Sequence, residues 1–271
     1  MPILPLLIEP AELQQHLHDS NLLIVDLCKH SQYQQLHIPG AVFLDYGYLT
    51  AVNHPAMGFL PDAEQISHVL AALGFTSDSH VVAYDEEGGG KAARLIWTLH
   101  ALGHCKTSLL NGGLISWYKE QHPVTADATR ITDVPCKVNY TNMAVVADRH
   151  YILAHLDDSK VALLDARSLG EYSGEKRFAD RAGRIPGAKH FEWTDGIDLE
   201  KNYRLLPDNV LLKKLAALDL TPDKEIIVYC QTHHRSALSY FMLKNLGYEK
   251  VRGYPGSWSD WGNRVDTPIE S

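Results

Sequence analysis

The chain has 271 residues, of which 45% are hydrophobic and 21% are charged. This length accommodates two domains of ordinary size, and the composition excludes a largely disordered protein. The formal net charge of -8 excludes a general attraction to nucleic acid or to anionic membranes, so an anionic substrate requires a local positive site.

Targeting and redox signals are absent from the sequence. The first ten residues are apolar but contain three prolines, and they lack the basic start and the cleavage site of a signal peptide. No stretch approaches the ~18 apolar residues of a membrane span. The four cysteines are widely spaced, which argues against a zinc site or a disulfide framework. We therefore expect a cytoplasmic protein without metal, membrane or nucleic-acid partners, in which Cys28, Cys105 and Cys136 are buried small hydrophobic residues.

The predicted elements of the first half alternate between β-rich and helical segments. In chain order we note a strand ending at Asp26, the segment His37-Ile-Pro-Gly-Ala41, a helix opened by Leu60-Pro-Asp62, a strand from Val81 to Tyr84, the tripeptide Ala101-Leu-Gly103, and Gly112 with Trp117. This alternation is typical of an α/β domain with a mainly parallel sheet flanked by helices.

The second half repeats the same features in the same order. They are Leu163-Leu-Asp165-Ala-Arg167, Arg184-Ile-Pro-Gly-Ala188, Leu206-Pro-Asp208, Ile226-Ile-Val-Tyr229, Asn245-Leu-Gly247, and Gly253 with Trp258. At least six ordered matches favour duplication over coincidence. The extra segment from Ser173 to Arg181 belongs in a loop.

The repeats predict two similar domains. We assign residues 1–125 to a first domain, 126–148 to a linker and 149–271 to a second domain. Ligands of parallel sheets bind beyond the carboxyl ends of the strands, which directs attention to the loops after Tyr84 and Tyr229.

The loop after Tyr229 carries a thiol where an anion would be stabilised. It reads Cys230-Gln-Thr-His-His-Arg-Ser236, and an amphipathic helix that ends at Gly247 follows. Backbone N–H groups at a strand-to-helix turn and the helix dipole favour a thiolate. Because polar residues follow Cys230 directly, we predict that it is a catalytic nucleophile and not core filling.

The other residues of this loop are candidate substrate contacts. Arg235 lies where a cation opposes the helix dipole, which is easier to explain if it meets a bound anion. His233 and His234 either donate hydrogen bonds to the substrate or line a polar rim, and both readings stay open. The remaining candidates are Gln231, Thr232 and Ser236.

The matching loop of the first half has lost the nucleophile. Asp85 occupies the cysteine position, and the acidic run from Asp85 to Glu87 would repel an anion. We therefore interpret the first domain as an inactive structural partner, with a phosphate-binding glycine loop as the alternative.

Paired units with Ile-Pro-Gly-Ala segments, and a loop cysteine in the second unit alone, resemble the tandem-domain rhodanese family. The resemblance covers nearly the whole chain. It implies an α/β fold with two rhodanese-like domains and a catalytic Cys230. It also implies transfer of a sulfane sulfur from thiosulfate to cyanide or another thiophilic acceptor, with neither metal nor organic cofactor. We expect a monomer that uses small-molecule donors and acceptors, with a protein sulfur acceptor as a further option.

Two departures from the family pattern affect the expected site. The loop matches neither Cys-Arg-Lys-Gly of thiosulfate-preferring relatives nor Cys-Gly-Ser-Gly of mercaptopyruvate-preferring ones, so the donor stays open, with thiosulfate favoured. Glu171 occupies the position where longer relatives place a substrate-binding Arg. Anion binding must then rely on Arg235 and the loop amides, with Arg184 or Arg177 as helpers. The resemblance gives Asp165 and Arg167 a supporting role in organising the loop.

Four other functions compete with this reading. A 3-mercaptopyruvate sulfurtransferase or a protein persulfide carrier would use the same residues. A cysteine-dependent phosphatase would need an Arg six residues after the cysteine, where this chain has Ser236. A noncatalytic binding module lacks a recognisable aromatic or basic surface pattern.

Overall fold

The expected alternation of strands and helices is present in the structure, a computed structural model that describes residues 4–271. The chain divides by its internal contacts into two units. Unit 1 comprises the chain through Leu49, Pro61–Asn142 and Ile197–Leu205. Unit 2 comprises Thr50–Leu60, Met143–Gly196 and Leu206–Ser271. Each half of the sequence therefore contributes one short segment to the unit formed mainly by the other half.

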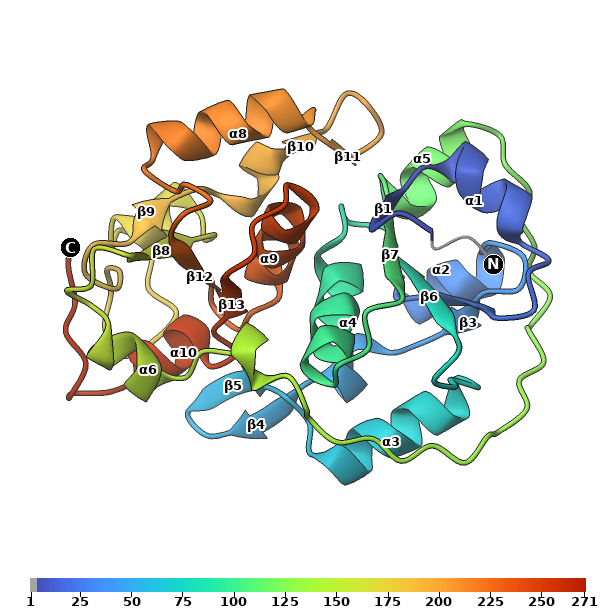
Figure 1. Cartoon of the computed structure of the whole chain (residues 1–271), viewed down its shortest axis with the longest axis horizontal. Coiled ribbons are helices and arrows are strands. Elements are labelled where there is room, and N and C mark those ends of the chain that lie inside the picture. The colour runs from blue at the N-terminus through green and yellow to red at the C-terminus, as the bar shows by residue number, and fades with distance from the viewer. Residues whose placement is uncertain (1–3) are drawn as a thin grey trace. The chain divides into compact units, whose positions relative to one another are not determined.

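Unit 1 contains a five-stranded parallel sheet with the order β1-β7-β6-β2-β3, and a two-stranded antiparallel sheet, β10-β11 (Figure 1). Its elements are β1 (Leu7–Ile8), α1 (Pro10–His16), β2 (Leu22–Asp26), α2 (His30–Gln35), β3 (Val42–Phe43), η1 (Tyr46–Leu49), α3 (Ala63–Ala72), β6 (His80–Tyr84), α4 (Gly90–Ala101), β7 (Thr107–Leu110), α5 (Gly113–Lys119), β10 (Ile197–Asp198) and β11 (Arg204–Leu205).

Unit 2 contains a four-stranded parallel sheet with the order β13-β12-β8-β9 and an antiparallel hairpin, β4-β5. Its elements are β4 (Ala51–Asn53), β5 (Ala56–Phe59), η2 (Met143–Val145), α6 (Arg149–Ala154), β8 (Val161–Asp165), α7 (Leu169–Tyr172), β9 (Lys189–His190), η3 (Trp193–Gly196), α8 (Asp208–Ala217), β12 (Glu225–Tyr229), α9 (Arg235–Asn245), β13 (Val251–Gly253) and α10 (Ser257–Trp261). The expectation of two α/β domains with mainly parallel sheets is confirmed.

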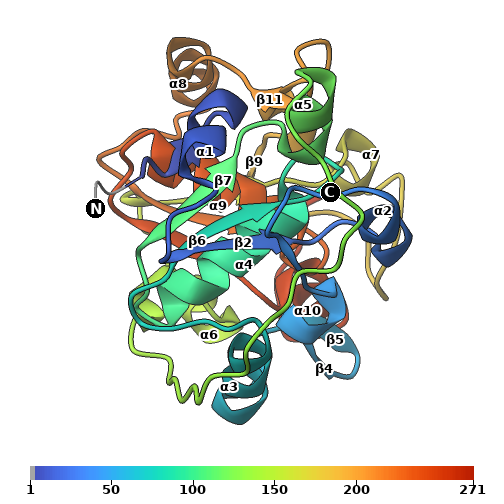
Figure 2. The same cartoon turned by 90° about the vertical axis from the view of Figure 1, so that its right-hand side faces the viewer.

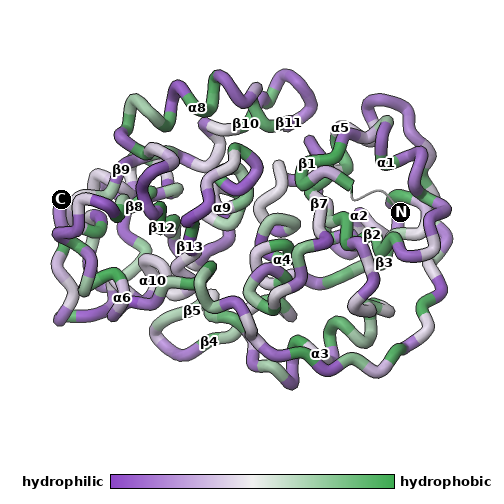
Figure 3. Tube along the Cα trace, viewed as in Figure 1, coloured by the Kyte–Doolittle hydropathy of each residue, from purple (hydrophilic) through white to green (hydrophobic). Residues whose placement is uncertain are grey.

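Helices cover both faces of the sheet in unit 1. In Figure 2, α3 and α4 lie below the strands, whereas α1 and α5 lie above them. Buried side chains of α1 and α5, including Leu13 and Trp117, form one core with Ile24, Val82 and Tyr84 of the sheet. Figure 3 shows hydrophobic and hydrophilic residues alternating along α3, as expected for a helix with one buried face.

Unit 2 has a corresponding core. Ile152 of α6 and the tryptophans Trp258 and Trp261 of α10 cluster with Ile227 and Tyr229 of the central strand β12. Because β12 is buried on both faces, its side chains from Ile226 to Tyr229 are all fully covered. The strand therefore gives the residue that follows it a rigid base.

The two units share details that confirm the duplication but correct one pairing of residues. Trp117 donates from Nε1 to the carbonyl oxygen of Pro123 at 2.7 Å, and Trp261 donates to that of Pro268 at 2.8 Å. Trp117 therefore corresponds to Trp261, and the pairing of Trp117 with Trp258 is wrong. The error arose because α10 contains two tryptophans, and each lies five residues after a glycine, as Trp117 does after Gly112: Trp258 after Gly253 and Trp261 after Gly256.

The sequence-based interpretation of the cysteines is confirmed in part. Cys28 is buried in the core of unit 1, as expected. The expectation of burial is wrong for Cys105, which is exposed, and for Cys136, which is partly buried. Both lie in connecting segments, Cys105 between α4 and β7 and Cys136 between α5 and η2. Side chains in such segments need not be buried. None of the helices formed by residues 4–271 is both long and apolar enough to cross a bilayer.

Candidate active site

The central strand of unit 2 delivers Cys230 to a turn between a strand and a helix. β12 pairs in parallel with β8 up to the partners Tyr229 and Asp165, and Cys230 is the next residue. The helix α9 begins five residues later at Arg235. The Cys230 residue is only 1% exposed. The thiol thus lies between the carboxyl end of a buried strand and the amino end of a helix, as the sequence predicts.

The start of α10 holds the backbone of this loop. Cys230 N–H donates to Oγ of Ser257 at 3.2 Å. In return, the N–H groups of Trp258 and Ser259 donate to the carbonyl oxygens of Cys230 and Gln231, each at 3.0 Å. These bonds tie the backbone of Cys230 and Gln231 to the start of α10.

The surroundings of Cys230 favour its thiolate. Burial raises the pKa of the Cys230 thiol, but the charge of Arg235, the hydroxyl of Ser236 and the N–H groups of Ser236 and Thr232 lower it, and the net direction is downward. The thiol therefore gives up its proton more readily than an ordinary cysteine. A lowered pKa makes a buried cysteine a nucleophile.

The two histidines of the loop differ in environment. His233 is buried with a positive φ of 55°, and its Nδ1 lies 2.8 Å from Oγ of Ser236. If Nδ1–H donates to that oxygen, the Ser236 hydroxyl is free to donate to the sulfur. His234 packs near the Trp193 ring, with 6.3 Å between ring centroids.

Gln231 donates from Nε2 to the Phe178 carbonyl oxygen at 3.0 Å.

Arg235 has a carboxylate partner that sequence reasoning missed. Its Nη1 lies 2.7 Å from Oε2 of Glu171, and its Nη2 lies 2.8 Å from Oε1. The cation at the helix start is thus balanced by the residue expected to weaken anion binding. Ser168-Leu-Gly-Glu171 has the spacing of a capping box, and this signal would have placed Glu171 in the first turn of a helix, though not next to Arg235. Donor binding by Arg235 stays a prediction.

The supporting residues Asp165 and Arg167 form a buried ion pair under the loop. Nε of Arg167 donates to both carboxylate oxygens of Asp165, at 2.9 and 3.1 Å. The guanidinium lies over the rings of Tyr229 and Trp258, at 5.5 and 4.4 Å from the centroids. Neither side chain is more than 1% exposed. The pair therefore braces the strand end and the α10 helix.

The proposed helper arginines have other partners in the structure. Nη2 of Arg184 donates to Oε1 of Glu270, and its guanidinium lies 4.5 Å from the centroid of the Tyr172 ring. Nη1 of Arg177 lies 3.4 Å from the carbonyl oxygen of Asp180. Within residues 4–271, neither guanidinium forms a hydrogen bond or an ion pair with the Cys230 loop.

The corresponding loop of unit 1 holds the carboxyl group of Asp85, whose pKa is raised by burial and by the charge of Glu87 in spite of its backbone hydrogen bonds. The Asp85 carboxylate is fully buried and accepts hydrogen bonds from the backbone N–H groups of four residues. The donors are Glu87 at 3.0 Å, Gly89 at 2.8 Å, Lys91 at 2.9 Å and Ala92 at 3.0 Å. The loop after β6 therefore binds a side-chain carboxylate at the position where the loop after β12 presents a sulfur.

The acidic neighbours of Asp85 share one cation. Nζ of Lys91 lies 3.1 Å from Oε1 of Glu86 and 3.4 Å from Oε2 of Glu87. The acidic run is therefore paired, and the carboxylate of Asp85 itself fills the anion position. The expected inactivity of this loop stays a prediction, which the placement of the Asp85 side chain supports.

A hairpin from the first half of the sequence completes unit 2 next to the Cys230 loop. Met57 exchanges backbone hydrogen bonds with the Ser259 hydroxyl, at 3.0 Å in each direction. Gly58 has a φ of +86°, and a Cβ at this position would lie 2.2 Å from the carbonyl oxygen of Thr232. The approach therefore requires glycine. Sequence reasoning missed this hairpin, because Gly58 lies far from Thr232 along the chain.

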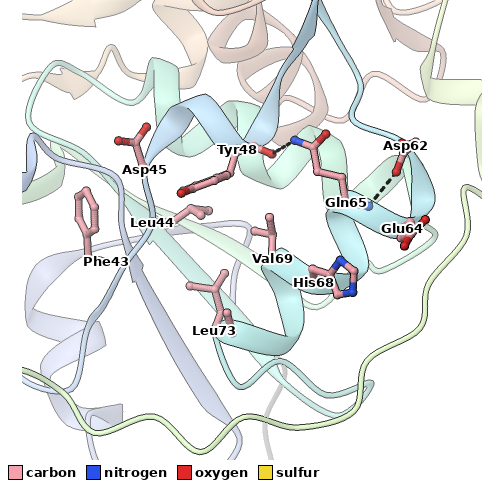
Figure 4. Close-up of a pocket in the computed structure, with 11 residues that line it drawn as sticks. Phe43, Leu44, Asp45, Tyr48, Asp62, Glu64, Gln65, His68, Val69 and Leu73 are labelled. Atoms are coloured by element: carbon pink, nitrogen blue, oxygen red, sulfur yellow. Dashed lines mark hydrogen bonds between the residues drawn. The ribbon is translucent and has the colours of Figure 1, made fainter.

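A cavity of about 640 Å³ lies elsewhere, in unit 1, between η1 and α3 (Figure 4). Tyr48, Asp45, Asp62, Glu64 and His68 are among its lining residues. None of the lining residues belongs to the loops after Tyr84 and Tyr229, and none is a cysteine. No group of three His, Cys, Asp or Glu side chains within residues 4–271 is arranged to hold a metal ion.

The fold and the loop define a class of protein with a buried cysteine at the carboxyl edge of a parallel sheet, in front of a helix. Comparison with known families agrees, because the rhodanese-like domain matches residues 9–120 and again 148–264. The chain belongs to the rhodanese-like family.

Similar proteins share nearly the full length of the chain. A thiosulfate sulfurtransferase of Azotobacter vinelandii is 43% identical over 98% of this chain and 97% of its own length. A thiosulfate sulfurtransferase of Pseudomonas aeruginosa is 40% identical over the same shares. The fold is similar to that of an anaerobic ergothioneine biosynthesis enzyme from Chlorobium limicola, with a TM-score of 0.87 and 21% identity over 98% of this chain and 70% of that one.

The contact between the hairpin and the loop predicts unequal effects of two glycine substitutions. Gly58→Ala and Gly40→Ala both place a side chain at a positive φ, but a Cβ on Gly40 meets nothing within 4 Å. We expect Gly58→Ala to displace Thr232 and to slow alkylation of Cys230 by roughly 10- to 100-fold, as for a misplaced reactive group. Gly40→Ala should change only stability. Mass spectrometry of the Cys230 peptide measures the rate, and equal rates in the two variants would contradict the contact.

The anion position of unit 1 predicts a stability effect. Asp85→Asn leaves one acceptor oxygen for four N–H donors, and we expect a loss of about 3 kcal/mol in the free energy of unfolding. Asp78→Asn, at a side chain that is 89% exposed, is the control and should cost less than about 0.5 kcal/mol. Urea denaturation measures both. Equal midpoints would show that the loop does not depend on the carboxylate.

Proposed function

We propose that the protein is a thiosulfate sulfurtransferase in which Cys230 carries the transferred sulfur as a persulfide. The observation that supports this most strongly is the environment of the Cys230 sulfur. A buried thiol meets the hydroxyl and N–H of Ser236, the N–H of Thr232 and the charge of Arg235, and its pKa is lowered. The same donors would stabilise the terminal sulfur of a persulfide, which is also an anion.

The first half-reaction is a substitution at sulfur. The Cys230 thiolate attacks the outer sulfur of thiosulfate, a bond forms between the two sulfurs, and the sulfur–sulfur bond of thiosulfate breaks. Its electron pair leaves with sulfite, so the enzyme holds a Cys230 persulfide anion. The amino end of α9 and the loop N–H groups are suited to hold the sulfonate while this occurs.

The second half-reaction restores the thiolate. Cyanide, or another thiophilic acceptor such as a thiol, attacks the outer sulfur of the persulfide, and the electron pair of the broken bond returns to Cys230. With cyanide the product is thiocyanate. Two half-reactions that share one covalent intermediate predict ping-pong kinetics.

A second cysteine, Cys105, supports a cytoplasmic location for the reaction. Cys105 is an exposed free thiol, and exposed thiols persist in reducing compartments. We therefore place the reaction in the cytoplasm, and we propose that a monomer carries it out.

The proposal predicts the mass of the protein. After treatment with thiosulfate, intact protein should gain one sulfur atom, and cyanide should remove it with release of an equal amount of thiocyanate. Cys230→Ser should show neither effect, because no other thiol lies in this loop. Cys105→Ser removes the exposed thiol and is the matched control, which should keep both.

Thiocyanate production by Cys230→Ser at the parent rate would overturn the proposal. So would a loss of the added sulfur in Cys105→Ser alone, because the carrier would then be the exposed thiol.

A further inference from the structure

The guanidinium of Arg235 offers its terminal nitrogens to Glu171. The two contacts, at 2.7 and 2.8 Å, use one N–H of each terminal nitrogen. A guanidinium forms paired, parallel hydrogen bonds of this kind with a planar carboxylate, and its specificity for carboxylates rests on them. The face of Arg235 best suited to a donor's carboxylate is thus occupied by a side chain of the protein itself.

Glu171 is also held from its other side. Oε2 accepts hydrogen bonds from the N–H of Ser168 at 3.2 Å and from its hydroxyl at 2.8 Å. The Glu171 side chain is 6% exposed. Burial raises the pKa of Glu171, but the lowering by Arg235 and Ser168 is larger, and the pKa falls to about 2. Glu171 is therefore charged near neutral pH and fixed at the start of α7.

Displacement of Glu171 by a donor would be unfavourable. The donor's carboxylate would replace one ion pair with another, while Glu171 would be left buried without its cation. The Ser168 contacts oppose its rotation away from Arg235. A donor whose anionic group requires the paired contact of Arg235 is therefore at a disadvantage at this loop.

A sulfonate does not need the paired hydrogen bonds of Arg235. Its three oxygens are arranged around sulfur and can accept single hydrogen bonds from separate N–H groups. Arginine has five N–H donors, and those outside the Glu171 pair remain for single contacts. The loop after β12 and the amino end of α9 supply backbone donors, and the unit 1 loop shows that four such donors can converge on the oxygens of one group.

We infer that Glu171 is a specificity-determining residue, which occupies the paired nitrogens of Arg235 and thereby favours compact sulfonate donors over α-keto carboxylate donors. The inference rests on the proposed function. With 3-mercaptopyruvate, the Cys230 thiolate would attack the donor sulfur and break its carbon–sulfur bond. The released carbon would take the thiol proton to give pyruvate, so the same persulfide would form.

The test compares two donors in the full-length chain. The value of kcat/KM is measured for thiosulfate and for 3-mercaptopyruvate, with cyanide as the acceptor. Glu171→Gln keeps the size of the side chain but removes its charge and one acceptor oxygen, which frees an Arg235 nitrogen. We expect the ratio of 3-mercaptopyruvate to thiosulfate to rise by roughly tenfold or more, as for one charge-assisted hydrogen bond.

A matched control is available in the same unit. Glu225 pairs with Arg252, with 3.1 Å between Oε1 and Nε, at the start of β12 and thus at the opposite end of that strand from Cys230. Glu225→Gln should leave the donor ratio unchanged. If Glu171→Gln proves unstable in a thermal melt, Glu171→Ala gives the same comparison and the same expected direction.

The outcomes separate the two proposals. A wild-type protein that forms thiocyanate from neither donor contradicts the proposed function. A wild-type protein that uses thiosulfate, with a donor ratio that stays unchanged or falls in the stable Glu171 variant, overturns this inference alone. A wild-type preference for 3-mercaptopyruvate also overturns it, and leaves the role of Cys230 intact.

Discussion

The structure depends on backbone N–H groups that converge on one anion where a buried strand meets a helix. The duplicated chain uses this arrangement twice. After β6 the anion is the Asp85 carboxylate, which takes four N–H donors. After β12 the same position holds Cys230, whose thiol pKa is lowered by Arg235 and by the loop donors in spite of burial. One loop binds the acidic side chain of Asp85, whose pKa is raised by burial, and the other binds the thiol of Cys230.

Much of the remaining structure keeps the second loop in place. The buried pair of Arg167 and Asp165 braces the end of the sheet, and the amino end of α10 holds the loop carbonyls. The Glu171 carboxylate fixes Arg235 and compensates its charge. The cation therefore acts on the pKa of Cys230 from a fixed position, while its strongest contact is already taken. The loop N–H groups and the paired Arg235 are the features on which the proposed binding and release of an anion depend.

The sequence predicted the duplicated fold and the place of Cys230, because both depend on local patterns: strands of apolar residues, a helix with one apolar face, and a polar loop between them. It did not predict the Glu171 partner or the hairpin at Gly58. Those depend on contacts across 64 residues for Glu171 and Arg235, and on a close approach of two backbones for Gly58. The Trp117 pairing failed because two tryptophans compete for one position. The Glu171–Arg235 ion pair and the close approach of Gly58 can be recognised only in the three-dimensional structure, which brings distant segments of the chain together.

The measurement that tests the central claim most directly is a titration of the Cys230 thiolate by its ultraviolet absorbance, with Cys230→Ser as the blank. The account predicts a midpoint below the ordinary cysteine pKa of about 8.5. Because a cation stabilises the thiolate, Arg235→Gln should move the midpoint upward, and Arg235→Lys, which keeps the charge, should move it less. A midpoint at or above the ordinary value, unchanged in Arg235→Gln, would contradict the claim that this loop holds a sulfur anion.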